Sequence, residues 1–140
     1  MSSTNVHPLL ALLEQDKRYK LDAYQFVRDA LDYAQSVMQM PLQETGDSGR
    51  SVERHITGQQ LCEAIRQYAV QQYGFLAKAV LNSWGVYSTG DFGEIVYNLI
   101  RIKLMKKSKT DRREDFDDVY IFEGAFEPDF STEEEDDVPF

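Results

Sequence analysis

The sequence is poor in the residues that build metal sites and nucleophilic active sites, with one cysteine and two histidines in 140 residues. Cys62 alone cannot form a disulfide within the chain. His55, Cys62 and Glu63 are close in sequence but fall short of the four ligands that a zinc site needs. A serine or cysteine nucleophile needs a positioned base, and only His7 and His55 are available. The sequence therefore predicts no metal and no cofactor, and it gives an enzyme no support.

Long apolar runs are missing as well. No stretch approaches the roughly 20 consecutive apolar residues that a membrane-spanning helix requires. The apolar run near the start covers only Leu9 to Leu13, with no basic region before it and no cleavage site of small residues after it. We therefore expect a cytoplasmic protein that carries no signal peptide and does not enter a membrane.

Basic residues are absent from the last part of the chain. The sequence contains 24 acidic and 15 basic residues, for a net charge of −9. Residues 114–140 include 12 acidic residues and no lysine or arginine, whereas residues 101–113 include seven basic residues and one acid. Runs of like charge repel themselves and stay solvated. Residues 127–140 are therefore predicted to form a disordered acidic tail.

The apolar content that is present suffices for one folded domain, since 42% of the residues are hydrophobic and 12% are aromatic. A chain of this length buries about two thirds of its unfolded surface around a single core. We expect that domain over residues 17–126. Residues 1–16 form an N-terminal segment in which Pro8 suits the first turn of a short helix, because its missing N–H has no partner there.

The first long helix is predicted from apolar residues that recur at helical spacing after Asp22. Asp22 is the expected N-cap, with Gln25 three residues later. The apolar positions are Phe26, Val27, Ala30, Leu31, Ala34 and Met38. Residues 41–54 follow with a proline, two glycines and no periodicity, which is the composition of a surface loop.

The second long helix has the clearest start signal, because Thr57 and Gln60 have the spacing of a capping box. Its apolar stripe continues in phase across Gly74, so one bent helix or two shorter helices both fit. Within a helix, Gly74 would cost about 1 kcal/mol relative to alanine. A break or the close packing of a neighbouring element is therefore expected there. Gly85 is the expected C-terminal stop.

Residues 91–93, Asp-Phe-Gly, form the tripeptide that binds magnesium in protein kinases. A kinase also needs a glycine-rich loop, a strand lysine and a His-Arg-Asp loop, and the sequence contains none of them. Asp91 and Glu94 instead have the spacing of an N-cap and a returning carboxylate. They predict the start of a third amphipathic helix, which the cations of residues 101–109 would close at its negative end. Its apolar stripe is Phe92, Ile95, Val96, Leu99 and Ile100.

Residues 119–122, Val-Tyr-Ile-Phe, form a β-prone apolar run that is too short for a helix. They predict a short strand or an extended arm that lies over the helices. The predicted fold class is therefore mainly α. We expect a compact bundle of three to four helices, a short C-terminal strand or extended arm, and the acidic tail.

Three segments carry a resemblance to a known family. They are residues 54–58 (RHITG), residues 84–99 (WGVYSTGDFGEIVYNL) and residues 111–116 (DRREDF). Over about residues 17–126 the chain resembles a small uncharacterised protein family restricted mainly to planctomycete and verrucomicrobial bacteria. The resemblance implies a bacterial cytosolic protein and brings no activity, cofactor or partner with it.

Four aromatic residues surround the turn into the third helix. They are Trp84, Tyr87, Phe92 and Tyr97. Such clusters are more often core than ligand cages, but any exposed part of this one would be the best surface for a partner. The leading hypothesis is a non-enzymatic protein-interaction module that presents this turn and the acidic tail to a protein partner.

A second hypothesis is a nucleic-acid or ribosome-associated protein, in which the acidic tail competes with phosphates for the basic segment 101–113. Its candidate phosphate-contacting residues are Arg101, Lys103, Lys106, Lys107, Lys109, Arg112 and Arg113. An enzyme of unknown reaction ranks third, because nothing better than proximity supports a site built from its scattered candidates. Those candidates are His55, Glu63, Asp91 and Glu94.

Overall fold

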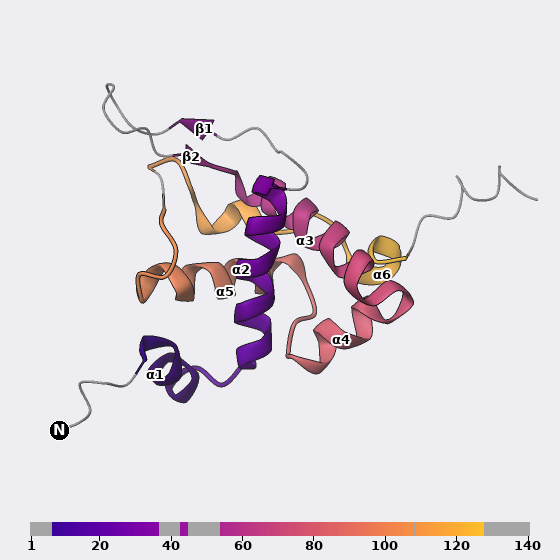
Figure 1. Cartoon of the computed structure of the whole chain (residues 1–140), viewed down its shortest axis with the longest axis horizontal. Helices are drawn as coiled ribbons and strands as arrows, with labels where there is room; N and C mark the ends of the chain where they lie inside the picture. The colour runs from indigo at the N-terminus through magenta and orange to yellow at the C-terminus, as the bar shows by residue number, and fades with distance from the viewer. Residues whose placement is uncertain (1–6, 37–42, 45–53, 108, 128–140) are drawn as a thin grey trace, which may run out of the picture.

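The computed structural model describes residues 7–36, 43–44, 54–107 and 109–127 (Figure 1). The elements are α1 (Pro8–Gln15), α2 (Leu21–Ser36), β1 (Gln43–Glu44), β2 (Arg54–His55), α3 (Gly58–Tyr73), the 3-10 turn η2 (Gly74–Leu76), α4 (Ala77–Ser83), α5 (Thr89–Arg101), the 3-10 turn η3 (Arg113–Phe116) and α6 (Phe122–Ala125). β1 and β2 form one short antiparallel pair. The mainly helical fold class is confirmed.

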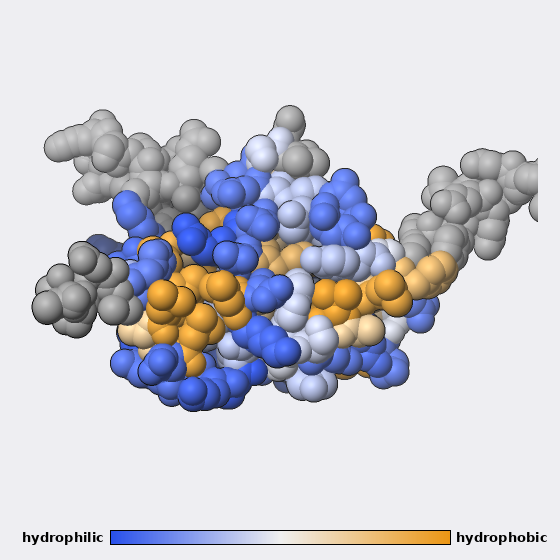
Figure 2. All heavy atoms as spheres, turned by 60° about the horizontal axis from the view of Figure 1, so that its bottom comes forward, coloured by the Kyte–Doolittle hydropathy of each residue, from blue (hydrophilic) through white to orange (hydrophobic). Residues whose placement is uncertain are grey.

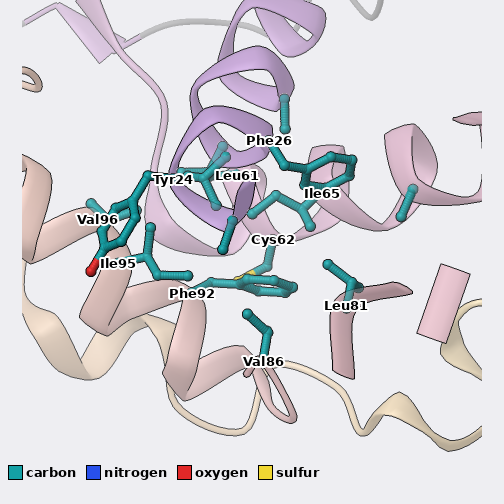
Figure 3. Packing of buried hydrophobic residues seen from close by; sticks show 14 of the residues in the cluster. Tyr24, Phe26, Leu61, Cys62, Ile65, Leu81, Val86, Phe92, Ile95 and Val96 are labelled. Carbon is teal, nitrogen blue, oxygen red and sulfur yellow. The ribbon is translucent and has the colours of Figure 1, made fainter. Parts of the chain in front are cut away.

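α2 stands at the centre of the molecule and packs against both α3 and α5 (Figure 1). α1 and α4 flank the end at which α2 begins, and the Lys20 N–H donates to the Trp84 carbonyl at 3.2 Å there. The core lies where α2, α3 and α5 meet. The ring of Phe92 lies between Cys62 and Val86, and all three are fully buried (Figure 3).

The start of α1 confirms the short N-terminal helix. Pro8 is its first residue, and the Nδ1 atom of His7 caps it by accepting a hydrogen bond from the Leu9 N–H at 3.0 Å. Leu9 and Leu12 are buried, since they lie on the face turned to the core. His7 is therefore a helix cap.

The prediction that Asp22 is the N-cap of α2 is wrong. The helix begins at Leu21, before Asp22, and the Ala23 N–H donates to the Lys20 carbonyl at 2.9 Å. Asp22 lies inside the first turn, where its charge still suits the positive end of the helix dipole. Of the predicted apolar positions, Phe26, Val27, Ala30 and Ala34 are buried, Leu31 is half-buried and Met38 lies outside the described residues.

The predicted capping box of α3 is confirmed. The Thr57 hydroxyl accepts from the Gln60 N–H at 3.0 Å, and the Gln60 side chain accepts from the Thr57 N–H at 2.8 Å. α3 ends at Tyr73 because Gly74 adopts a positive φ of 56°. Gly74 therefore breaks the helix, and α4 continues the chain in a new direction. Nothing lies within 4 Å of a Cβ placed on Gly74, so its role is conformational.

Gly85 confirms the predicted stop. α4 ends at Ser83, and the Val86 N–H reaches back to the Leu81 carbonyl at 3.0 Å, while Gly85 has φ of 95°. A positive φ with such a return bond is the usual way in which a glycine ends a helix. A Cβ on Gly85 would lie 2.1 Å from the Arg18 carbonyl oxygen. Gly85 is therefore required both by its φ and by the loop packed on it.

The start of α5 corrects a second predicted cap. Ser88 is the N-cap, and Asp91 is the N3 residue whose carboxylate returns to the Ser88 N–H at 3.2 Å. The Asp91 N–H donates to the Ser88 hydroxyl at 3.3 Å. In a capping box the N-cap residue carries a hydroxyl, and the acid lies three residues later. Asp91 is therefore the acid of this box and not its N-cap. Glu94 takes no part in the cap.

The cations predicted to close α5 lie mostly beyond it. The helix ends at Arg101, and Lys103 adopts the left-handed conformation with φ of 68°. Only Arg101 lies in the last turn, where it suits the negative end of the dipole. Lys106, Lys107 and Lys109 follow on the connection to η3.

The C-terminal segment is an arm and contains no strand within residues 109–127. The chain is extended at Asp117 and again at Ile121, on either side of a turn. It is fastened by the Tyr120 hydroxyl, which donates to the Cys62 carbonyl at 2.8 Å. The buried rings along the arm are Phe116, Phe122 and Phe126. The acidic tail from residue 128 and most of the predicted loop 41–54 lie outside the described residues.

Gly85→Ala tests the contact between the end of α4 and the loop before α2. We expect it to lower the free energy of unfolding by about 3 kcal/mol or more, since a clash with backbone adds to an unfavourable φ. Gly74→Ala is the matched control, with a positive φ but open space, and should cost about 1 kcal/mol. Urea unfolding followed by circular dichroism measures both. Equal costs for the two variants would contradict the role of the Arg18 contact.

Candidate functional site

The first turn of α5 is where chain segments distant in sequence meet. The Asp91 carboxylate accepts from the Tyr19 hydroxyl at 2.6 Å and from the Tyr87 N–H at 2.8 Å, in addition to its capping bond. Tyr19 is buried, and burial first, followed by the hydrogen bond to Asp91, raises the pKa of its hydroxyl. The hydroxyl therefore stays protonated and donates. Asp91 acts as an anchor for the backbone and for the loop before α2.

Glu94 joins the same loop to the C-terminal arm. Its carboxylate accepts from Arg18 at 3.1 Å and from Arg113 at 2.8 Å. Arg113 also pairs with Asp117 at 2.8 Å and donates to the Gly90 carbonyl at 2.9 Å. The hydrogen bond from Arg113 is the main cause that lowers the pKa of Glu94. An ionised Glu94 therefore links three parts of the chain.

Asp16 and Asn98 continue the polar contacts of Arg18 and Glu94 into the core, and we call the whole set the polar network. Arg18 pairs with Asp16 at 2.7 Å and is the main cause that holds the pKa of Asp16 far below its usual range. The buried Asn98 amide donates to Asp16 and to the Tyr24 hydroxyl, both at 3.0 Å. Its oxygen accepts from Arg101 at 2.7 Å. A buried amide with its partners in place fixes how α2 and α5 pack, because any other packing leaves it unsatisfied.

Gly93 lets the arm approach α5 closely. A Cβ at this position would lie 2.8 Å from the Cβ of Phe116 and 2.9 Å from a guanidinium nitrogen of Arg113. Any side chain would therefore push η3 away from the helix. Arg113 lies in η3 and forms the ion pair with Glu94. The ion pair therefore depends on the close approach that Gly93 allows.

An open depression lies between the first turn of α5 and the arm, and we call it the Tyr87 groove. It has a volume of about 260 Å³. It is lined by Tyr87, Ser88, Thr89, Gly90, Asp117, Asp118, Tyr120, Ile121 and Phe122. Tyr87 is 64% exposed and Ile121 is 73% exposed, so two large side chains stand at its rim in water. The buried Thr89 hydroxyl accepts from the Val119 N–H at 3.2 Å and joins the two walls.

A second, smaller cavity of about 70 Å³ lies on the other side of α5, and Tyr97 is in its wall. Its apolar lining comes from α2, α3, α5 and η3, and includes Leu31, Leu61, Val96, Ile100 and Phe116. The Tyr97 hydroxyl is buried and has no hydrogen-bond partner among the described residues. Burial first, and then the charge of Asp111, raises the pKa of Tyr97. The cavity therefore presents a neutral phenol with an unused donor.

The four aromatic residues named as a candidate interaction surface lie in different environments. Phe92 is fully buried and packs on Phe122 with ring centroids 5.7 Å apart, which removes it from any surface. It belongs to the apolar stripe of α5 that faces α3. Trp84 is half-buried at the end of α4 and Tyr97 lines the cavity. Of the four residues only Tyr87 is exposed, so the expectation that an exposed part of this cluster contacts a partner applies to Tyr87 alone, and Phe92 is a core residue.

The predicted phosphate-contacting residues divide into two groups. Arg113 is engaged by Glu94 and Asp117, and the Arg101 side chain donates to Asn98. Their charges are largely used within the fold. The other members are exposed on the segment between α5 and η3. They are Lys103, Lys106, Lys107, Lys109 and Arg112.

The scattered catalytic candidates have separate partners. Glu63 pairs with Arg66 on the surface of α3, whereas Asp91 and Glu94 belong to the network described above. Burial raises the pKa of the Cys62 thiol to about 12, which keeps it protonated and unreactive. The side chain of His55 lies outside the described part of the structure. Within the described ranges, no three His, Cys, Asp or Glu side chains gather closely enough to bind a metal ion.

Comparison of the chain with models of protein families, with curated proteins and with solved structures gives no match. The case for a function then depends on the geometry of the described residues. In the structure, parts of residues 54–58, 84–99 and 111–116 line the Tyr97 cavity together. In the described parts of the chain, no helix has the length and apolar character needed to cross a membrane.

Glu94→Gln tests the network through its charge. At pH 7 we expect the free energy of unfolding to fall by about 1 kcal/mol, as two partly exposed ion pairs are weakened. The pKa of Glu94 and Asp16 is lower in the folded chain than in the unfolded one, so their stabilisation is present above about pH 5 and is lost as the pH falls through the folded values. The gap between wild type and variant should therefore shrink in acid.

Urea unfolding at pH 7, 5 and 3 provides the measurement. Glu14→Gln on the exposed side of α1 is the control and should change the free energy of unfolding by less than about 0.5 kcal/mol. A gap between wild type and Glu94→Gln that stays constant across this pH range would show that the charge of Glu94 is not the cause.

Proposed function

We propose that the chain is a non-enzymatic protein-interaction module of the cytoplasm, which binds a protein partner through the Tyr87 groove. One observation carries the proposal. Tyr87 and Ile121 are both more than 60% exposed and both line the same depression. Large apolar side chains that gather in water at the rim of a depression are typical of a surface that another protein covers.

The energetics of such a surface favour binding. Burying apolar area stabilises a complex by about 25 cal/mol per Å², and tyrosine is among the residues that contribute most to binding at interfaces. Tyr87 at the rim is suited to enter a pocket of the partner. The groove beside it can accept an apolar side chain in return, with Phe122 in its lining.

The groove is also held in one shape before a partner arrives. The Asp91 carboxylate fixes the backbone of Tyr87 and Ser88, and Thr89 fixes the arm at Val119. A surface that is ordered in advance pays less conformational entropy on binding. The network of Glu94 and Arg113 therefore supports the proposed function by positioning both walls.

A second candidate function is nucleic-acid binding by the basic segment, and the exposure of five of its cations to solvent favours it. Lysine and arginine side chains that contact phosphates release counterions, so such binding falls steeply with salt. We expect fluorescence anisotropy of a labelled RNA or DNA to show binding at 20 mM salt and none at 300 mM. A chain truncated after Glu127 should bind more tightly, since the acidic tail no longer competes. Absence of binding by either form would exclude this function.

Replacement of Tyr87 by photoreactive benzoylphenylalanine tests the Tyr87 groove directly. Irradiation of cells that contain the chain should give a discrete adduct at position 87. The same replacement at Leu10 is the control, because Leu10 is a 53% exposed apolar side chain on α1 that does not line the groove. Figure 2 shows the face that carries α1 and α4, with separate apolar areas over the two helices.

The purified partner then provides the quantitative test by isothermal calorimetry. Tyr87→Ala with Ile121→Ala should weaken its binding about thirtyfold, the equivalent of a loss of about 2 kcal/mol. Leu10→Ala should leave the affinity unchanged. Equal affinities for the wild type and the groove variant would overturn the proposal.

A further inference from the structure

A third depression, of about 200 Å³, lies between α2 and α3. One stripe of α2, with the spacing i, i+3, i+4 and i+7, forms one side of it. Its lining consists of Asp22, Gln25, Phe26 and Asp29 from α2, Tyr68, Gln72 and Tyr73 from α3, and Trp84 from the end of α4. Its volume is several times the roughly 30 Å³ that one water molecule occupies in the liquid. We call it the aromatic–acidic groove.

The rings form a floor and walls. Phe26 is buried beneath, with its ring centroid 5.1 Å from Tyr68 and 5.4 Å from Trp84. Trp84 and Tyr73 stand nearly perpendicular to each other, at 80° with centroids 6.1 Å apart. Tyr68, Tyr73 and Trp84 are each half-buried, so part of every wall faces solvent. Tyr73 and Trp84 pack edge to face, and the exposed parts of both rings line the groove. An aromatic face attracts a cation within about 6 Å of its centroid.

The rim adds formal charge of the matching sign. Asp22 and Asp29 are both exposed, and in the described part of the chain neither carboxylate makes a hydrogen bond or an ion pair. The pKa of the Tyr68 hydroxyl is raised, first by burial and then by the charge of Asp29. The groove is therefore electrically negative as well as aromatic. Neither property alone would select a ligand, but together they select an organic cation.

We propose that the aromatic–acidic groove binds an arginine side chain of a basic peptide segment in a partner protein. The planar guanidinium stacks on aromatic faces and offers five donors in a fork that matches carboxylates. Asp22 and Asp29 lie seven residues apart on α2, two turns along the groove, so an arginine held against the rings has a carboxylate on the rim towards each end of the groove. Lysine has a strongly hydrated point charge and fits such a site less well. This site stands independently of the Tyr87 groove.

The chain contains its own reporter for this site, because Trp84 is the only tryptophan. The probes are blocked peptides of the form Gly-X-Gly-X-Gly, where X is arginine, lysine or glutamine. The arginine peptide should change the emission of Trp84 in a saturable way. The lysine peptide should bind at least about threefold more weakly, and the glutamine peptide should cause no change. No saturable response to arginine, or an equal response to lysine, would overturn the assignment.

Matched variants separate the site from general attraction to an acidic chain. Asp22→Asn with Asp29→Asn should weaken the arginine peptide about tenfold. Glu14→Gln with Glu114→Gln removes the same charge from exposed positions elsewhere and should change the affinity less than twofold. Circular dichroism checks that all variants are folded.

Equal losses in the two double variants would show that the peptide responds only to net charge, and would refute the groove. Tyr87→Ala with Ile121→Ala should leave peptide binding intact. This result keeps failure of the arginine site distinct from failure of the Tyr87 groove.

Discussion

The hydrogen bonds of the Asp91 carboxylate are the interaction on which the start of α5 and the loops around it depend. It satisfies backbone N–H groups that the first turn of a helix cannot pair internally, and it accepts the hydroxyl of Tyr19 at the same time. One side chain thus sets where α5 begins, how the loop before α2 lies against it and where the backbone of Tyr87 is held. Packing of α5 on the core then follows, because Phe92 is the next residue along the helix.

Much of the fold is predictable from short-range patterns, and the reason is physical. The capping box at Thr57, the helix stops at Gly74 and Gly85 and the apolar stripe of α5 all depend on residues within a few positions of each other. The errors are also local. Asp22 and Asp91 are acids near helix starts, and each can act as an N-cap, a first-turn charge or an N3 partner. Only the backbone geometry decides between these roles.

The candidate sites are much less predictable, because their partners are distant in sequence. Glu94 pairs with Arg18, 76 residues earlier, and with Arg113, 19 residues later. Nothing in the spacing of these residues indicates the pairing. Asn98 is the exception, because a polar residue among the apolar positions of α5 is itself a sign of a buried hydrogen-bonding group. The Tyr87 groove depends on the fold of the arm, and the arm's sequence indicates only a short apolar run.

The position of the arm in the chain determines when the core can be completed during synthesis. Phe116, Phe122 and Phe126 are buried against helices that all precede them in the chain, and Arg113 completes the ion pairs of α5. A ribosome releases these residues after the helices that they cover. During synthesis, the emerging helices therefore present an incomplete apolar core until the arm emerges. Chaperones that shield nascent chains would have their longest opportunity to act on this protein during that interval.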